Sequence, residues 1–139
     1  MRGILADVNV QGQLPYLVRL MENMGLTDIL EDLQLRFFTF RDFGLSPRMD
    51  DRSLWQFCQL GKFVLLTENR NHDGPDSLTA TLLDSWVQGL LPVLTLGNKG
   101  KFDNHPEYAV RVAGDIADLL FDFAHGAQRD RARIFIPIR

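Results

Sequence analysis

The segment that decides the fold reads FVLLTENRNHDGPDSL and occupies residues 63–78. Its first four residues, 63–66, are apolar and predict a short buried strand. An unbroken run of polar residues, 67–73, follows this strand, and residues 75–77 then predict the cap of another helix. A buried strand that ends in polar residues is typical of parallel sheets, which bind ligands at the carboxyl ends of their strands.

The rest of the chain repeats this alternation of strand and helix. Further apolar runs predict buried strands at 3–6, 36–40 and 92–96, and a last strand at 133–138, in which Pro137 suits an edge. Helical spacing of apolar residues predicts helices over 14–25, from Asp50 or Asp51 onward, from 78 to 86, and over 109–123. Residues 41–51 predict a loop. This order predicts one domain, residues 1–139, with an α/β fold: a three-layer α/β/α sandwich with a mostly parallel central sheet.

Two helical faces follow from the same spacing. In the helix after residue 77, the buried face is predicted to carry Leu78, Leu82, Leu83 and Trp86. In the helix over 109–123, the buried face includes Leu119. These faces would cover the sheet.

Charge, hydropathy and cysteine content bear on the partners and the location expected for this protein. The 139 residues carry a net charge of −3, with no strongly basic face in the sequence, so charge alone does not predict a nucleic-acid partner. The first ten residues lack the pattern of a signal peptide, and no apolar run is long enough to span a membrane. Because Cys58 is the single cysteine, no internal disulfide can form. We therefore expect a cytoplasmic protein without a membrane partner, either monomeric or a homo-oligomer.

Polar residues follow three of the predicted strands. Asp7 and Asn9 follow residues 3–6, residues 67–71 follow the strand at 63–66, and Gly97 to Lys101 follow the strand at 92–96. Because parallel strands end at the same edge of a sheet, these side chains are expected to converge there. Carboxylate and amide oxygens suit Mg²⁺, although a single Asp or Asn more often stabilises a turn or a helix cap.

Three segments carry a resemblance to a known family. ILADVNV (residues 4–10), FRDFGLSPRMDDRSLWQFC (residues 40–58) and FVLLTENRNHDGPDSL (residues 63–78) resemble the motifs of a PIN-like family of small bacterial proteins. The resemblance implies an α/β/α sandwich and a ribonuclease that depends on Mg²⁺ or Mn²⁺. It also implies that the chain can be the toxin of a toxin–antitoxin pair, with RNA as substrate and an antitoxin as protein partner.

The resemblance assigns roles to individual residues. Asp7 matches the acid that closes the first strand, Asp51 or Asp50 the acid that opens the central helix, and Thr67 the threonine after the third strand. The two acids that follow in the family's pattern fall on Asn69 and Asn71, while Glu68 lies one position away from the first of them. The predicted metal ligands are Asp7, Asn9, Asp51, Asn69 and Asn71. The predicted catalytic residues are Asp7, Asp51 and Glu68, and the predicted substrate-binding residues are Thr67, Arg70 and His72.

Two hypotheses remain open at this point. In the first, the chain is a metal-dependent ribonuclease that holds at most one Mg²⁺ or Mn²⁺, weakly, because two asparagines withhold negative charge. In the second, it is a catalytically weakened protein of the same fold that binds RNA or another protein. The sequence contains no phosphate-binding loop, zinc motif or Gly-x-Ser-x-Gly elbow that would favour a different chemistry.

Overall fold

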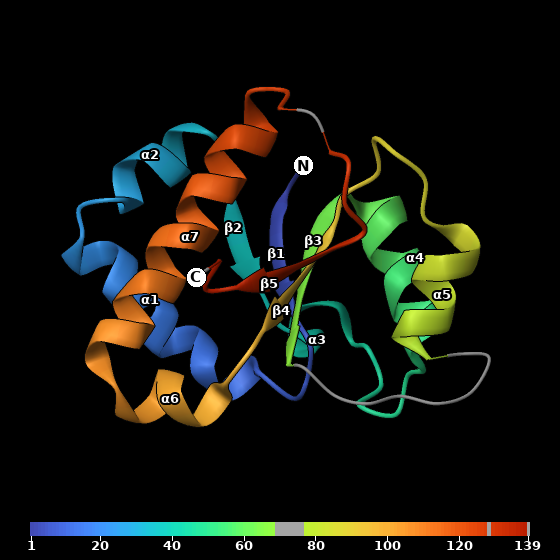
Figure 1. Cartoon of the computed structure of the whole chain (residues 1–139), viewed down its shortest axis with the longest axis horizontal. Coiled ribbons are helices and arrows are strands. Elements are labelled where there is room, and N and C mark those ends of the chain that lie inside the picture. The colour runs from blue at the N-terminus through green and yellow to red at the C-terminus, as the bar shows by residue number, and fades with distance from the viewer. Residues whose placement is uncertain (69–76, 128, 139) are drawn as a thin grey trace.

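The central feature of the computed structural model is a five-stranded sheet in which all strands are parallel, in the order β2-β1-β3-β4-β5 (Figure 1). The structure describes residues 1–68, 77–127 and 129–138. The strands are β1 (Gly3–Ala6), β2 (Arg36–Phe38), β3 (Phe63–Glu68), β4 (Val93–Leu96) and β5 (Arg133–Ile136). The predicted α/β class and parallel sheet are confirmed.

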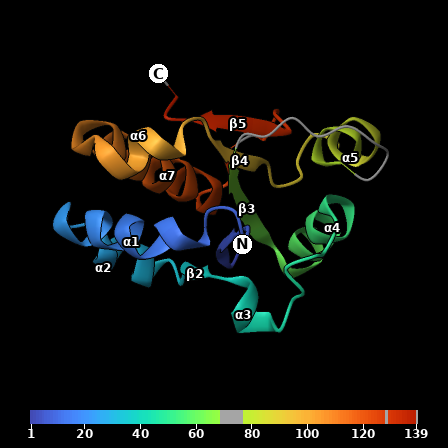
Figure 2. The ribbon, with the colours of Figure 1, turned by 90° about the horizontal axis from the view of Figure 1, so that it is seen from below.

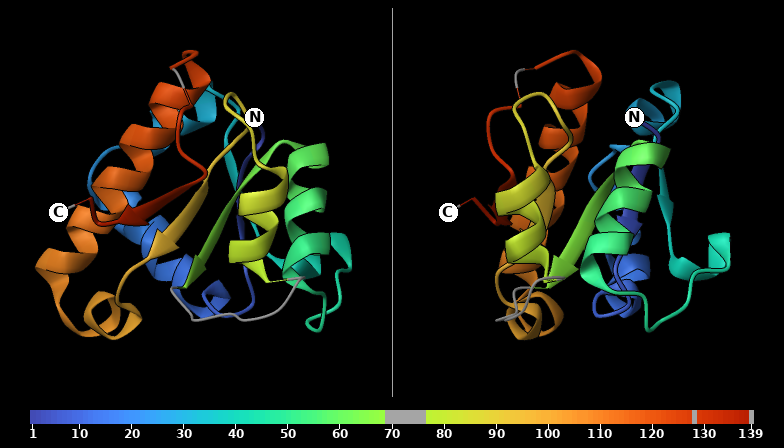
Figure 3. Two further views of the ribbon diagram at one scale, coloured as in Figure 1. Left: turned by 45° about the vertical axis from the view of Figure 1, so that its right-hand side comes forward. Right: turned by 90° about the vertical axis from the view of Figure 1, so that its right-hand side faces the viewer.

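Helices cover the sheet on both faces, which gives the three layers visible in Figure 2. A short 3₁₀ helix, η1 (Gln11–Gln13), precedes the first of seven α-helices in the described chain. These are α1 (Leu14–Asn23), α2 (Thr27–Asp32), α3 (Phe40–Phe43), α4 (Asp51–Gly61), α5 (Leu78–Ser85), α6 (Lys99–Asn104) and α7 (Pro106–Ala124). Helices α1 and α7 pack on one face, and α4 and α5 lie side by side on the other (Figure 3). Among the described residues, no helix has the length and apolar character needed to cross a bilayer.

The alternation of side chains along β3 builds two cores. Val64 and Leu66 join the core beneath α1 and α7, whereas Phe63 and Leu65 join the core beneath α4 and α5. Successive residues of a strand point to opposite faces, so a strand buried on both faces is apolar throughout. This explains why β1, residues 63–66 of β3 and all of β4 except Thr95 are apolar in the sequence.

The strand predicted at 36–40 is only partly correct. β2 ends at Phe38, because Thr39 and Asp42 form a capping box that starts α3 at Phe40, inside the predicted strand and ahead of the predicted loop. The expected burial is also wrong for this strand. β2 lies at the edge of the sheet, so Arg36 is exposed and Phe37 is half-buried.

Smaller differences concern strand ends and helix faces. β5 lies at an edge of the sheet, as expected from Pro137, but it ends at Ile136 and not at residue 138 as predicted. Leu83 on α5 is 81% exposed, so its predicted place on a buried face is wrong. On α7, Ile116 and Leu120 are each 0% exposed, whereas Leu119 is only partly buried, so its predicted place on the buried face is only partly correct.

Candidate functional site

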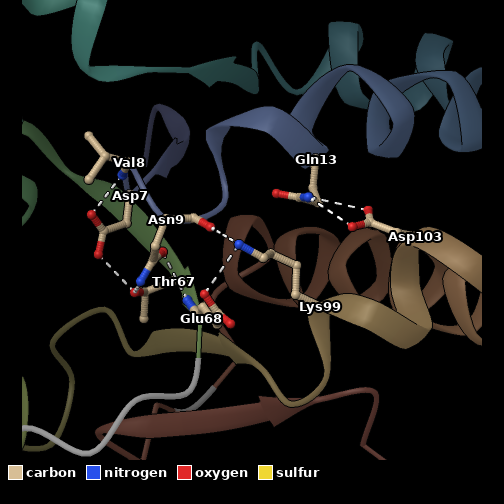
Figure 4. A network of polar contacts seen from close by, with 8 residues as sticks. All are labelled: Asp7, Val8, Asn9, Gln13, Thr67, Glu68, Lys99 and Asp103. Atoms are coloured by element: carbon tan, nitrogen blue, oxygen red, sulfur yellow. Dashed lines mark hydrogen bonds and ion pairs between the residues drawn. The ribbon is translucent and has the colours of Figure 1, made fainter.

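Polar side chains gather where β1, β3 and β4 end, as Figure 4 shows. Asp7 is the first residue after β1, and its backbone N–H donates to the carbonyl of Leu66, which extends the pairing of β1 with β3. Its Oδ1 accepts from the N–H of Val8 at 2.7 Å. The carboxylate is thus oriented by the turn that follows the strand.

Thr67 links the ends of the two strands. Its hydroxyl donates to Asp7 Oδ2 at 2.8 Å, although the threonine is only 4% exposed. A buried hydroxyl needs a hydrogen-bond partner, and a carboxylate is a strong one. The contact therefore fixes the position of Asp7 from the neighbouring strand.

Asn9 completes this connection through both ends of its side-chain amide. Its Nδ2 donates to the Thr67 hydroxyl at 3.2 Å, and its Oδ1 accepts from the backbone N–H of Glu68 at 3.1 Å. The amide therefore continues the pairing between β1 and β3 beyond the last residues of β1. Two of the predicted ligands, Asp7 and Asn9, lie in one hydrogen-bonded group with Thr67 and Glu68.

Lys99, which follows β4 in the chain, contacts the same group of side chains. Its ammonium donates to the backbone carbonyl of Asn9 at 3.1 Å and lies 3.5 Å from a carboxylate oxygen of Glu68. Lys99 is the first residue of α6, which begins after the cap formed by Asn98. No site role was predicted for it, although it belongs to the polar run expected at this edge. Beside it, Gln13 of η1 donates to Asp103 of α6 at 3.2 Å.

Asp50 and Asp51 have different roles. The Asp50 side chain accepts from the N–H of Ser53 at 2.7 Å and caps α4, and this bond, together with one from the Ser53 hydroxyl, lowers the pKa of Asp50. Asp51 instead accepts from the N–H of Leu78, at the start of α5, at 3.0 Å. The carboxylate of Asp50 is therefore engaged at its own helix, while that of Asp51 reaches the neighbouring helix.

The charges of Asp7 and Asp51 act on the side of the sheet that α4 and α5 cover. Burial raises the pKa of the Cys58 thiol to about 12, and the negative charge of Asp7 adds to the rise. A thiol with this pKa stays protonated at neutral pH, which excludes Cys58 as a nucleophile in this state. Burial lowers the pKa of Arg133, and the charge of Asp51 partly offsets that effect.

The described residues at this edge offer few oxygen ligands for a hard cation. In the part of the chain that the structure describes, no three His, Cys, Asp or Glu side chains lie close enough together to hold a metal ion. Asp7 offers a carboxylate and Asn9 an amide oxygen, while the carboxylate of Glu68 is paired with Lys99. Mg²⁺ is commonly bound through one or two carboxylates with several waters, so this set is sparse but chemically suitable. The predicted residues Asn69, Arg70, Asn71 and His72 lie outside the described residues.

A cavity of about 960 Å³ lies elsewhere, beside the edge strand β2. Its walls come from β2, α1 and α2, and its charged residues are of both signs: Arg2, Arg36, Glu22 and Glu31. We place the candidate site at the ends of β1, β3 and β4 instead, because carboxylate, amide, hydroxyl and ammonium groups converge there.

Comparison with known proteins adds no relative to this description. No protein-family model, curated protein or solved structure gives a significant match to the chain. The resemblance to the PIN-like family therefore rests on the three sequence segments and remains a prediction.

Proposed function

We propose that this protein is a slow, PIN-like ribonuclease that uses one Mg²⁺ or Mn²⁺ at the carboxyl edge of its sheet. The observation that carries the proposal is the fixed carboxylate of Asp7, which accepts from the Thr67 hydroxyl at 2.8 Å and from the Val8 N–H at 2.7 Å. A carboxylate held from two sides presents its charge in one direction, as a metal ligand must. The toxin role, the antitoxin partner and the cytoplasmic location belong to the same proposal.

Each residue of the site has a distinct part in this proposal. Asp7 and Asn9 supply oxygens for the ion, and Thr67 positions the carboxylate. Lys99 offers positive charge to a phosphate, and its pairing with Glu68 limits the net negative charge of the edge. Asp51, the first residue of α4, is the second acid of the proposal and lies on the side of the sheet that α4 and α5 cover. A bound Mg²⁺ would neutralise negative charge that develops on the phosphate of the substrate.

A second function is favoured by the ion pair of Glu68 with Lys99. With the two groups 3.5 Å apart, one of the few carboxylates at this edge is already partnered by a cation from the chain itself. A site in which a lysine takes part of the role of a metal can bind a phosphate without hydrolysing it. In this alternative, the protein is a weakened member of the fold that binds RNA or a protein.

The experiment that separates the two functions combines metal binding and catalysis on one sample. Mg²⁺ and Mn²⁺ are titrated by calorimetry, and cleavage of a single-stranded RNA is measured at each metal concentration. The ribonuclease proposal expects weak binding of one ion and slow cleavage, both lost in Asp7→Asn. Asp32→Asn, an exposed carboxylate on α2, is the matched control and leaves both unchanged. Cleavage that persists in Asp7→Asn contradicts the proposed site, and RNA binding without metal-dependent cleavage favours the second function.

A further inference from the structure

A groove lies where α2 meets the C-terminal half of α7, away from the candidate site. It encloses about 220 Å³ and is lined by Leu26, Ile29, Leu30, Ala117, Asp118 and Phe121. In Figure 1 this junction is at the upper end of α7, whereas β3 and β4 point toward the lower side of the molecule. The groove and the candidate site are therefore at opposite ends of the sheet.

The groove is flanked by large apolar side chains that remain in contact with solvent. Met24 is 39% exposed, Ile29 44% and Phe121 43%. On α7 the apolar surface continues through Gly114, where an added Cβ would lie 3.6 Å from the Met24 methyl, to Val110, which is 42% exposed. From Val110 to Phe121 this stripe extends for about 16 Å, or roughly three helical turns. Contiguous exposed apolar surface of this kind marks an interaction site.

Both helices that form the groove carry negative charge, and Asp118 of α7 lines the groove itself. Asp28 and Asp32 stand on α2, Asp118 and Asp122 stand on α7, and all four are exposed. α2 contains no lysine or arginine, and the single one on α7 is Arg111, which lies beside Val110 at the end of the stripe away from the groove. The members of each pair are four residues apart on one helix, a spacing at which like charges destabilise a helix slightly. A groove formed between two helices with this excess of negative charge is complementary to a basic partner.

We propose that this groove binds a helical segment of another protein, with an apolar face for the stripe and Lys or Arg along both flanks. An amphipathic helix laid into an apolar groove contacts it through side chains three and four residues apart, and about three turns of such a helix span the roughly 16 Å of the stripe. The flanking carboxylates select a basic segment and accelerate its association. A second copy of this chain is a poor occupant, because two-fold pairing would set the same four carboxylates against each other.

The test uses a synthetic peptide of 14 residues in which leucines line one helical face and lysines the other. The control peptide has the same composition in an order that places leucines on all sides. We expect the control to bind at least tenfold more weakly in fluorescence anisotropy. Phe121→Ser and the double variant Asp118→Asn, Asp122→Asn should each weaken binding of the amphipathic peptide at least fivefold. Leu83→Ser, at an 81% exposed leucine of α5, is the matched control and should leave binding unchanged.

Other outcomes overturn the proposal. If both peptides bind equally, or if Phe121→Ser binds as the wild type does, the groove is not the binding surface. If sedimentation shows a wild-type dimer that Phe121→Ser converts to a monomer, the occupant is a second copy of the chain. Ile29→Ser repeats the test on the α2 wall in case Phe121→Ser does not fold. Asp7→Asn should bind the peptide normally, so this result is independent of the ribonuclease proposal.

Discussion

The apolar and polar parts of β3 are stabilised in different ways. In the apolar half, residues 63–66, the side chains pack into the cores on both faces of the sheet. The polar half consists of Thr67 and Glu68. Leu66 and Thr67 are both 4% exposed, yet Thr67 depends on a hydrogen bond to Asp7, a residue 60 positions away in the sequence. Burial alone therefore does not separate the core from the site, whereas the kind of partner does.

A charge in the apolar half should have the largest effect. Val64 is 0% exposed, so Val64→Asp would bury an unpaired carboxylate, and we expect a loss of roughly 4 kcal/mol or more in the free energy of unfolding. Leu119→Asp, at a partly buried position on α7, should cost less, because its carboxylate can reach water. Urea denaturation of both variants measures the difference. An equal loss in both would show that α7 is placed wrongly.

The contrast within β3 also explains what the sequence could predict. β1, β3 and β4 are buried on both faces, so their apolar runs were sufficient to show where they lie. The end of β3 was missed, because the strand continues through Thr67 and Glu68 beyond the predicted residues 63–66. β2 is an edge strand, and its end depends on the capping box of Thr39 with Asp42, which competes with the strand for the same residues.

The site was predictable only where it depends on the direction of the strands. Parallel strands end together, and this brought Asp7 and Asn9 near Thr67. The place of Lys99 depends on where α6 begins, and the separate roles of Asp50 and Asp51 depend on where α5 lies. Both are set by tertiary packing, which the local pattern of residues does not contain.

A change in the polar half should have a moderate effect that depends on its partner. Thr67→Val keeps the shape of the side chain but removes the donor to Asp7, so we expect a loss of about 1–3 kcal/mol in stability. Thr95 is its register partner on β4 and is 1% exposed, but its hydroxyl has no hydrogen-bond partner among the described residues. Thr95→Val should therefore be neutral or stabilising. Thermal unfolding of the two variants measures the difference, and equal losses of stability in both would contradict this prediction.

The cap of α4 should have a smaller effect that varies with pH. Hydrogen bonds from Ser53 lower the pKa of Asp50 from its ordinary value of 3.8, so the folded state favours the ionised carboxylate. The contribution of Asp50 is then present above that ordinary value and is lost as the pH falls through the lower, folded pKa. Asp50→Ala should be less stable than the wild type at neutral pH, and the difference should shrink in acid. Denaturation at several pH values measures this, and a difference independent of pH would contradict it.

The smallest effect on stability is expected at Lys99, where the effect on metal binding is the informative one. The Lys99 and Glu68 side chains are 34% and 25% exposed, and a pair of this kind contributes about 0–1 kcal/mol, so Lys99→Met should barely change the unfolding temperature. The variant removes the Lys99 ammonium and so raises the negative charge of the edge. If the edge holds a cation, Mg²⁺ should bind several-fold more tightly in calorimetry, because the ammonium no longer offsets the negative charge near the ion. Under the alternative function, Lys99→Met should weaken RNA binding and leave Mg²⁺ binding absent. The ribonuclease proposal thus predicts tighter Mg²⁺ binding in Lys99→Met, whereas the alternative predicts weaker RNA binding and no Mg²⁺ binding. One substitution therefore distinguishes the two functions without disturbing the core beside the site.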